Sequence, residues 1–200
     1  MAEATDTYRT IAAPTQSLYK EKGSKFIGFA YPVDTEDEVK QILSQLRKTY
    51  FDARHCCYAY ILDAQGTTYR ANDDGEPNHS AGDPILGQIR SASLSHILVV
   101  VVRYFGGIKL GVSGLIQAYK TATAEAITQS AIVEKVETTT LQVNFGYEHM
   151  NAIMSLVKEY HLEIKEQDFN LRCRLQVAVR KTLVPVITGK LSGMATFDLI

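Results

Sequence analysis

Cysteine is scarce in this chain of 200 residues, which contains only three. The count is odd and Cys56 and Cys57 are adjacent, so the sequence does not imply a disulfide framework. Free thiols suit a reducing compartment, and we expect a cytoplasmic protein. Long apolar runs are also missing, because the longest, at residues 97–102, is far too short to span a bilayer. The N-terminal segment MAEATDTYRT lacks the basic and apolar regions of a signal peptide, so we expect no membrane partner.

A large excess of charge of either sign is absent as well. The chain has 21 basic and 22 acidic residues, which leave a net charge of −1. This balance argues against a uniformly basic nucleic-acid binder but leaves a local basic face open. Hydrophobic residues make up 46% of the chain, which is enough for a folded core, and the length fits one large domain or two small ones.

The established motifs of metal binding and catalysis are missing too. There is no C-x₂-C or H-x₃-H pair, although His55, Cys57 and His79 could meet in space. There is no G-x-S-x-G elbow, no P-loop and no G-x-G-x-x-G fingerprint. A pairing of Ser80 with His79 or His96, or of Cys57 with His79, stays open because geometry defines a catalytic triad. We expect neither a metal nor a cofactor.

The apolar pattern predicts alternating strands and helices over the first two thirds of the chain. Thr35 and Glu38 are spaced as a capping box at the start of a helix. The β-branched run at 96–105 is typical of a strand that is buried on both faces. We take Asp83 and Pro84 as the cap and first turn of a second helix. The expected strands cover residues 24–33, 54–62, 67–71 and 96–105, and the expected helices cover 35–50, 83–94 and 115–131.

A new series of strand and helix patterns begins after residue 134 and predicts a second domain. Strands are expected at 141–145, 161–166, 171–180 and 196–200, with helices at 149–160 and 182–191. This β-α-β-β-α-β order defines the ferredoxin-like unit. In the third strand we expect Leu171, Cys173, Leu175, Val177 and Val179 to point inward and Arg172, Arg174, Gln176 and Arg180 to face outward. We therefore divide the chain into domains at 1–137 and 138–200.

Residues 70–82 (RANDDGEPNHSAG), which we call the acidic loop, form the first segment that suggests a site. Asp73, Asp74, Glu76, His79 and Ser80 fall within eight positions of it. When Gly75 is aligned with the glycine of an EF-hand calcium loop, Arg70 and Ala81 fall on the first and last ligand positions, and neither supplies a carboxylate. The composition also fits a solvated turn, but the length favours an ordered, functional loop, so both interpretations stay open.

Residues 106–114 (GGIKLGVSG), which we call the glycine loop, form the second such segment. Four glycines stand between a buried strand and a helix, with Arg103 and Lys109 close by. Such a loop can hold an anion on backbone N–H groups, or its glycines can simply permit tight packing. We expect the two loops to meet in one recess of the first domain, with Asp74 or Glu76 paired with a basic residue.

Five segments resemble the IMPACT/YigZ family, in the family's order and spacing: SKFIG, RHCCYAY, DDGEP followed by SAGDPIL, VVVRYFGGIKLG and GLIQAY. The resemblance covers the first domain nearly end to end, and the second only by its order of elements, as in a bacterial member with a C-terminal ferredoxin-like module. It implies an α+β fold. The first domain is expected to be of the ribosomal-protein type with a left-handed βαβ unit, like domain IV of elongation factor G, and the second to be ferredoxin-like. The chain departs from the family at residues 78–80 and at Ser113, which we expect to cap the following helix.

The resemblance implies a regulator of translation that binds RNA, the ribosome or a translation-linked protein. Eukaryotic relatives regulate initiation under stress by blocking activation of a kinase that senses uncharged tRNA. The alternative is an enzyme that acts on a phosphate ester or nucleotide, or a hydrolase or peptidase. The family motif falls on Lys25, Asp73, Asp74, Gly75, Glu76, Pro77, Ala81, Gly82, Arg103, Tyr104, Gly106, Gly107, Lys109 and Gly111. Our candidates for a ligand site or surface cleft are Lys25, His55, Asp73, Asp74, Glu76, Ser80, Arg103, Tyr104, Gly106, Gly107 and Lys109, and the candidates to face RNA in the second domain are Arg172, Arg174 and Arg180.

Overall fold

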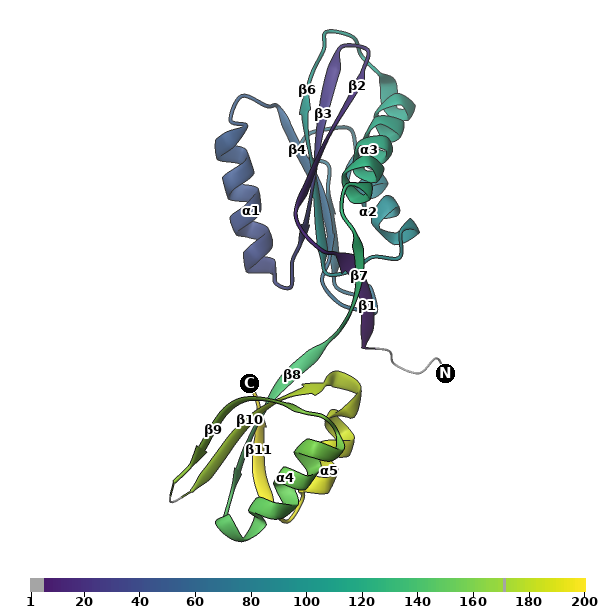
Figure 1. Cartoon of the computed structure of the whole chain (residues 1–200). Helices are drawn as coiled ribbons and strands as arrows, with labels where there is room; N and C mark the ends of the chain where they lie inside the picture. Colours follow the sequence, from purple (N-terminus) through teal and green to yellow (C-terminus); the bar gives the residue numbers. More distant parts are fainter. Residues whose placement is uncertain (1–5, 171) are drawn as a thin grey trace. The chain divides into compact units, whose positions relative to one another are not determined.

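The computed structural model describes residues 6–170 and 172–200, and it has the two-domain α+β architecture that the sequence predicts (Figure 1). The contacts divide the chain into an N-terminal unit, Thr7–Lys135, and a C-terminal unit, which joins Asp6 to Val136–Ile200. Within the described residues, no helix is both long and apolar enough to cross a membrane.

A five-stranded antiparallel sheet forms the centre of the N-terminal unit. Its order is β2-β3-β6-β4-β5. The strands are β2 (Thr15–Glu21), β3 (Ser24–Pro32), β4 (His55–Ile61), β5 (Tyr69–Asn72) and β6 (Ile97–Tyr104). The six residues 97–102 of the central strand β6 are fully buried, which confirms the prediction from their β-branched run.

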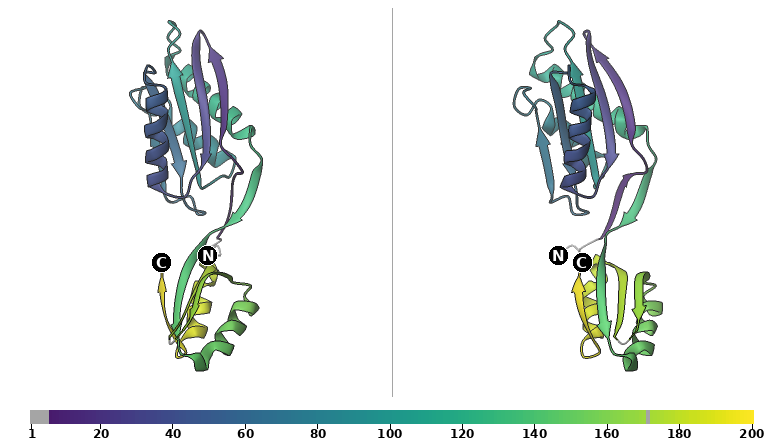
Figure 2. Two further views of the ribbon diagram at one scale, coloured as in Figure 1. Left: turned by 60° about the vertical axis from the view of Figure 1, so that its left-hand side comes forward. Right: turned by 90° about the vertical axis from the view of Figure 1, so that its left-hand side faces the viewer.

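Helices cover both faces of this sheet (Figure 2). One face packs against α1 (Glu36–Thr49), and the other packs against α2 (Gly82–Ser91) and α3 (Gly111–Thr128). The alternation along β3 follows this division, because Phe26 and Ala30 enter the core beneath α2 and α3, whereas Phe29 enters the core beneath α1. Each face therefore has its own apolar core.

Of the three helix caps that the sequence predicts, only the one at α1 is confirmed. The Thr35 hydroxyl accepts a hydrogen bond from the Glu38 N–H at 3.2 Å, and the Glu38 carboxylate accepts one from the Thr35 N–H, which confirms the capping box. The prediction that Asp83 caps α2 was wrong, since Ala81 holds the N-cap position. Ser113 likewise lies inside α3, whose N-cap is Leu110.

The sequence pattern missed three strands of the N-terminal unit. These are the edge strand β2 and the two-stranded sheet of β1 (Thr7–Ile11) with β7 (Ile132–Val136). Exposed or half-buried side chains dominate all three, and on β2 the buried residue is Ser17 whereas Leu18 is exposed, so the sequences lack the apolar alternation that identifies a half-buried strand.

The C-terminal unit has the predicted ferredoxin-like order of elements. It consists of β8 (Thr138–Phe145), α4 (Met150–Glu159), β9 (Glu163–Phe169), β10 (Cys173–Arg180), α5 (Val184–Leu191) and β11 (Ala195–Leu199), with 3₁₀ turns at Tyr147–His149 and Lys181–Leu183. The antiparallel sheet has the order β11-β8-β10-β9. The expected alternation on β10 is confirmed from Cys173 to Val179, and Leu171 lies outside the described residues.

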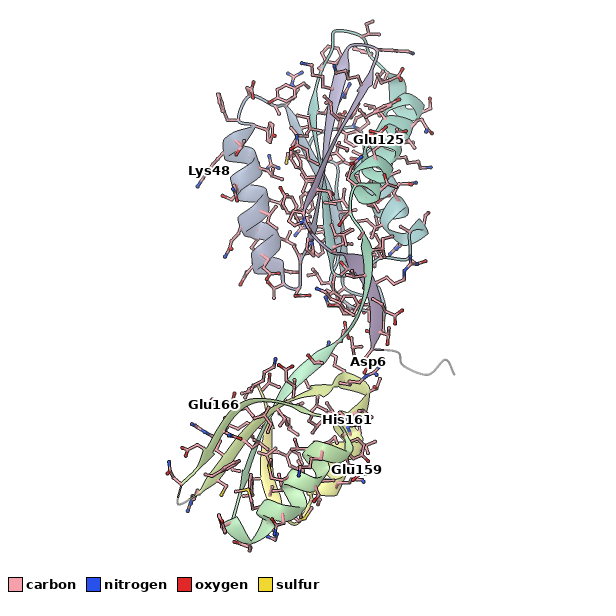
Figure 3. The ribbon with its side chains drawn as sticks, viewed as in Figure 1. Asp6, Lys48, Glu125, Glu159, His161 and Glu166 are labelled. Atoms are coloured by element: carbon pink, nitrogen blue, oxygen red, sulfur yellow. The ribbon has the colours of Figure 1, made fainter. Side chains whose placement is uncertain are left out.

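Asp6 belongs to the C-terminal unit through its carboxylate, which is labelled in Figure 3. The side chain is buried and accepts hydrogen bonds from the Arg180 guanidinium at 2.6 Å and from the Thr182 hydroxyl at 2.6 Å. The hydrogen bond from Arg180 is the main reason that the pKa of Asp6 lies well below its ordinary value. This contact holds Asp6 at the end of β10 within the C-terminal unit.

Candidate functional site

Four connecting segments meet at one end of the five-stranded sheet. β3 begins there at Ser24, β6 ends there at Tyr104, β4 begins at His55 and β5 ends at Asn72, as the strand registers require. The turn 22–23, the α1–β4 connection 50–54, the acidic loop and the glycine loop therefore share this end, which is at the top of Figure 1. We call it the loop end.

The glycine loop packs directly on the β2–β3 turn. A Cβ atom on Gly106 would lie 1.9 Å from the Gly23 carbonyl carbon and 2.1 Å from the Ser24 nitrogen. Only glycine permits so close an approach of two backbones. Gly107 and Gly111 adopt positive φ angles of 89° and 71°, so they serve the turn itself. The tight-packing interpretation therefore holds for Gly106.

Asp73 organises the acidic loop and caps α2. Its carboxylate accepts hydrogen bonds from the backbone N–H groups of His79 at 2.9 Å, Ala81 at 2.9 Å and Gly82 at 2.8 Å. A side chain ten residues upstream of Asp83 thus satisfies the helix start that Asp83 was expected to cap. Asp73 therefore stabilises the acidic loop and the start of α2.

Asp74 joins the acidic loop to α1 and β4. Its carboxylate forms an ion pair with Arg47 at 2.7 Å and accepts the Cys56 N–H at 2.7 Å. The backbone carbonyl of Asp74 lies 2.9 Å from Nδ1 of His55. Because a carbonyl can only accept, Nδ1 carries the proton and Nε2 of His55 is left for other partners.

Glu76 and Arg103 form the buried centre of the site. Both side chains are almost completely buried, and the Arg103 guanidinium lies 2.5 Å from Oε1 of Glu76. The same oxygen accepts a hydrogen bond from the Tyr119 hydroxyl at 2.9 Å, and the Cys57 thiol lies 3.3 Å from that hydroxyl. With the pair of Asp74 and Arg47, this contact confirms the predicted pairing of acidic-loop carboxylates with basic residues.

A cleft of about 350 Å³ opens between the acidic loop and the first turn of α3. The two polar segments thus meet in one recess, as predicted. The side chains around it are Arg54, His55, Glu76, Pro77, Arg103, Phe105, Lys109, Leu110, Gly111, Val112 and Leu115.

Four of the predicted cleft residues line this recess: His55, Glu76, Arg103 and Lys109. Lys25 and Tyr104 are register partners on the opposite face of the sheet, where the Tyr104 hydroxyl donates to Asp52 at 2.7 Å and this bond helps raise the pKa of Tyr104 to about 12. Ser80 is buried and its hydroxyl donates to the Pro77 carbonyl at 2.6 Å.

Arg54 and Phe105 line the cleft and were missed by the sequence analysis. Each stands next to a segment that had been singled out, Arg54 before β4 and Phe105 before the glycine loop. A search for charged and aromatic side chains within two residues of those segments would have found both.

The nucleophile–base pairs that the sequence left open are not assembled in the described residues. His79 is exposed and its Nδ1 contacts Asp83 at 2.6 Å, whereas Cys57 is fully buried beside Tyr119. Burial raises the pKa of the Cys57 thiol far above its ordinary value and that of Cys56 to about 11. His96 precedes β6 and stacks on Tyr8, away from the loop end.

Within the described part of the chain, no group of three His, Cys, Asp or Glu side chains is placed to hold a metal ion. His55, Cys57 and His79, which the sequence left open as a metal set, take the separate hydrogen-bond partners given above. The arrangement at the loop end is one of hydrogen bonds and ion pairs around an open recess.

The three arginines proposed to face RNA are exposed in the C-terminal unit, but two of them have acidic partners. Arg174 lies 3.4 Å from Glu166, which is labelled on β9 in Figure 3, and Arg180 contacts Asp6. The register places Asp168 and Asp198 on the same open face of the sheet. That face therefore carries little unbalanced positive charge, and its contact with RNA stays a prediction.

The fold and the loop end define a two-domain α+β protein with a recessed polar site on its first unit. The Impact N-terminal domain matches residues 22–127, which is just over half of the chain. The IMPACT family member YigZ of Escherichia coli K12 is 31% identical over 190 residues, covering 94% of this chain and 93% of its own. The chain therefore belongs to the IMPACT family.

Further comparisons agree with this assignment. The IMPACT family member YvyE of Bacillus subtilis is 32% identical over 158 residues, which cover 79% of this chain and 73% of its own. Human Protein IMPACT is 34% identical over 96 residues, or 46% of this chain and 29% of its own. A crystal structure described as that of a hypothetical protein superposes with a TM-score of 0.73 at 28% identity and covers 98% of both chains. The matches to the bacterial relatives thus extend over most of this chain, and the match to the human protein extends over less than half of it.

Proposed function

We propose that the protein regulates translation by binding single-stranded RNA at the loop end of its N-terminal unit. The observation that carries this proposal is the set of exposed basic side chains at that end. Lys20, Lys22 and Lys25 lie in the β2–β3 hairpin, Arg54 precedes β4 and Lys109 lies in the glycine loop. None of these five has an ion-pair partner among the residues that the structure describes. Such side chains suit the phosphates of an RNA backbone.

An aromatic ring adds a second feature that RNA requires. Phe105 is about half exposed beside the cleft, and the Arg103 guanidinium lies 5.7 Å from its ring centroid. Exposed aromatic rings stack on unpaired bases, and basic grooves follow the backbone. Three carboxylates without a basic partner also lie at this end: Glu21 and Asp52, which each accept from a tyrosine hydroxyl, and Asp73, which accepts from backbone N–H groups. The basic side chains outnumber them.

Fluorescence anisotropy with a 12-nucleotide, 5′-hydroxyl RNA labelled at its 3′ end tests the proposal. Four phosphate contacts give a log–log salt slope of about −2.8, so affinity is expected to fall about 50-fold between 50 and 200 mM salt. Replacing Lys22 and Lys25 with glutamine, or Lys109 alone, should lower the magnitude of the slope by about 0.7 per side chain. Lys135→Gln is the matched control, because Lys135 is exposed on β7, which lies at the opposite end of the N-terminal unit from the loop end (Figure 1).

Two outcomes would count against the proposal. One is an affinity that does not change with salt, and the other is an equal loss in the Lys135→Gln control. The double variant Arg172→Glu with Arg174→Glu examines the C-terminal unit separately, and unchanged affinity there would remove that face from RNA binding. Cleavage or dephosphorylation of a bound substrate would instead favour the alternative of an enzyme acting on phosphate esters or nucleotides.

A further inference from the structure

One atom in the cleft lacks the partner that its burial demands. Nε of Arg103 is buried and makes no hydrogen bond, although the side chain is only 7% exposed and the guanidinium already contacts Glu76. A buried donor on a charged group costs stability when it is left unsatisfied, so such an atom calls for an explanation. Because Arg103 lines the cleft, a bound anion would lie beside this incompletely satisfied guanidinium.

The first turn of α3 lines the same cleft. The helix is 18 residues long, its N-cap Leu110 makes no side-chain cap, and its first turn carries no acidic residue. Gly111 has no side chain to cover the N–H groups of this turn. The start of a long helix favours an anion through its free N–H groups and its dipole.

The charges around the cleft suit a dianion better than a monoanion. Arg54, Arg103 and Lys109 supply three positive charges and Glu76 removes one, which leaves two. The helix adds about half a charge. A terminal phosphomonoester carries roughly −1.5 to −2 at neutral pH, whereas an internal phosphodiester carries only one negative charge.

Two more groups fit the remainder of a nucleotide. Oε1 of Glu76 accepts from Arg103 and Tyr119, but Oε2 accepts no hydrogen bond from the described residues and can take one from a ribose hydroxyl. Phe105 can stack on the base. The volume of about 350 Å³ lies at the small end of the range for small-molecule sites.

We propose that this cleft binds the terminal phosphomonoester of a ribonucleotide. The phosphate lies against the first turn of α3 between Arg54, Arg103 and Lys109, and the ribose lies against Glu76. The ligand is either the phosphorylated end of an RNA strand or a free nucleoside monophosphate. The RNA source rests on the proposed function, whereas the free nucleotide does not.

Isothermal titration of the full chain with AMP, adenosine and dAMP tests the site without RNA. We expect AMP to saturate at one equivalent and adenosine to bind at least about tenfold more weakly, since it lacks the charge-assisted hydrogen bonds. The double variant Arg54→Gln with Lys109→Gln should weaken AMP binding about tenfold or more. Lys120→Gln on the exposed side of α3 is the matched control and should leave it unchanged.

Equal binding of AMP and adenosine would overturn the phosphate site. Equal binding of AMP and dAMP would overturn the contact between the ribose and Glu76. The wild-type chain suffices for both comparisons, so neither result depends on whether a variant folds.

A second titration compares RNA with a 5′-phosphate and the same RNA with a 5′-hydroxyl. A preference of about fivefold or more for the phosphate identifies an RNA end as the ligand. If AMP binds and the two RNAs bind equally, the site is one for free nucleotides. If RNA binds regardless of its end and AMP does not bind, the inference fails and the proposed function stands. If AMP binds and neither RNA does, the proposed function fails and the inference stands.

Discussion

Neutralising the carboxylate of Glu76 tests how much its buried ion pair with Arg103, which lines the cleft, stabilises the protein. Glu76→Gln keeps the shape of the side chain and an oxygen that can accept from Tyr119, but it removes the negative charge opposite Arg103. The side chains of Glu76 and Arg103 are 4% and 7% exposed, so solvent cannot replace the lost partner. Breaking a buried ion pair from one side costs about 3–5 kcal/mol. We expect the N-terminal unit to lose about that much stability.

Native-state hydrogen exchange, measured by mass spectrometry, reports this loss locally. Peptides from the central strand β6 give the free energy of opening of the N-terminal unit, and peptides from β10 serve as an internal control in the other unit. Glu134→Gln is the matched variant, because Glu134 is exposed and makes no ion pair with the described residues. It should change stability by less than about 0.5 kcal/mol.

A double-mutant cycle measures the interaction between Glu76 and Arg103 separately from the contacts that each makes with other residues. If the charges depend on each other, Glu76→Gln combined with Arg103→Met should cost clearly less than the sum of the two single changes, with a coupling of about 2 kcal/mol or more. Additive losses, or a loss below about 1 kcal/mol for Glu76→Gln alone, would refute the reasoning.

Three further predictions concern packing, pH and thiol chemistry. Gly106→Ala should destabilise the protein by about 3 kcal/mol or more in thermal melts, since its Cβ would meet backbone atoms at 1.9 Å, whereas Gly87→Ala, with nothing within 4 Å, should be neutral or stabilising. The pKa of Asp6 is lower in the folded state than in the unfolded state, so its carboxylate contributes fully to the free energy of unfolding above the unfolded value of 3.8, and this contribution is lost as the pH falls below it. The difference in stability between wild type and Asp6→Asn, measured by urea unfolding, should therefore shrink from pH 7 to pH 2.5. The buried thiols, with the pKa of Cys56 at about 11, should react with a disulfide reagent only after unfolding, and fast labelling of the native protein would contradict this.

The sequence predicted the elements whose residues carry strong local signals. The alternation of β3 and β10, the capping box at Thr35 and the buried run of β6 are all local patterns, because a strand or helix displays its own burial period. The order of elements was enough to recognise the ferredoxin-like unit. The edge strand β2 and the pair of β1 with β7 were missed, because they are held by neighbouring strands rather than by an apolar face of their own.

The sequence by itself also predicted that the acidic loop and the glycine loop meet in one recess of the first unit, as they do. Only the tertiary structure decided what each residue does there. Asp73 caps a helix, Asp74 holds α1, and Glu76 alone reaches Arg103 in the cleft. The three carboxylates share one loop, but the fold gives each of them different donors. Those of Asp73 come from its own loop and the start of α2, whereas Asp74 and Glu76 meet side chains that are distant in sequence, Arg47 and Arg103.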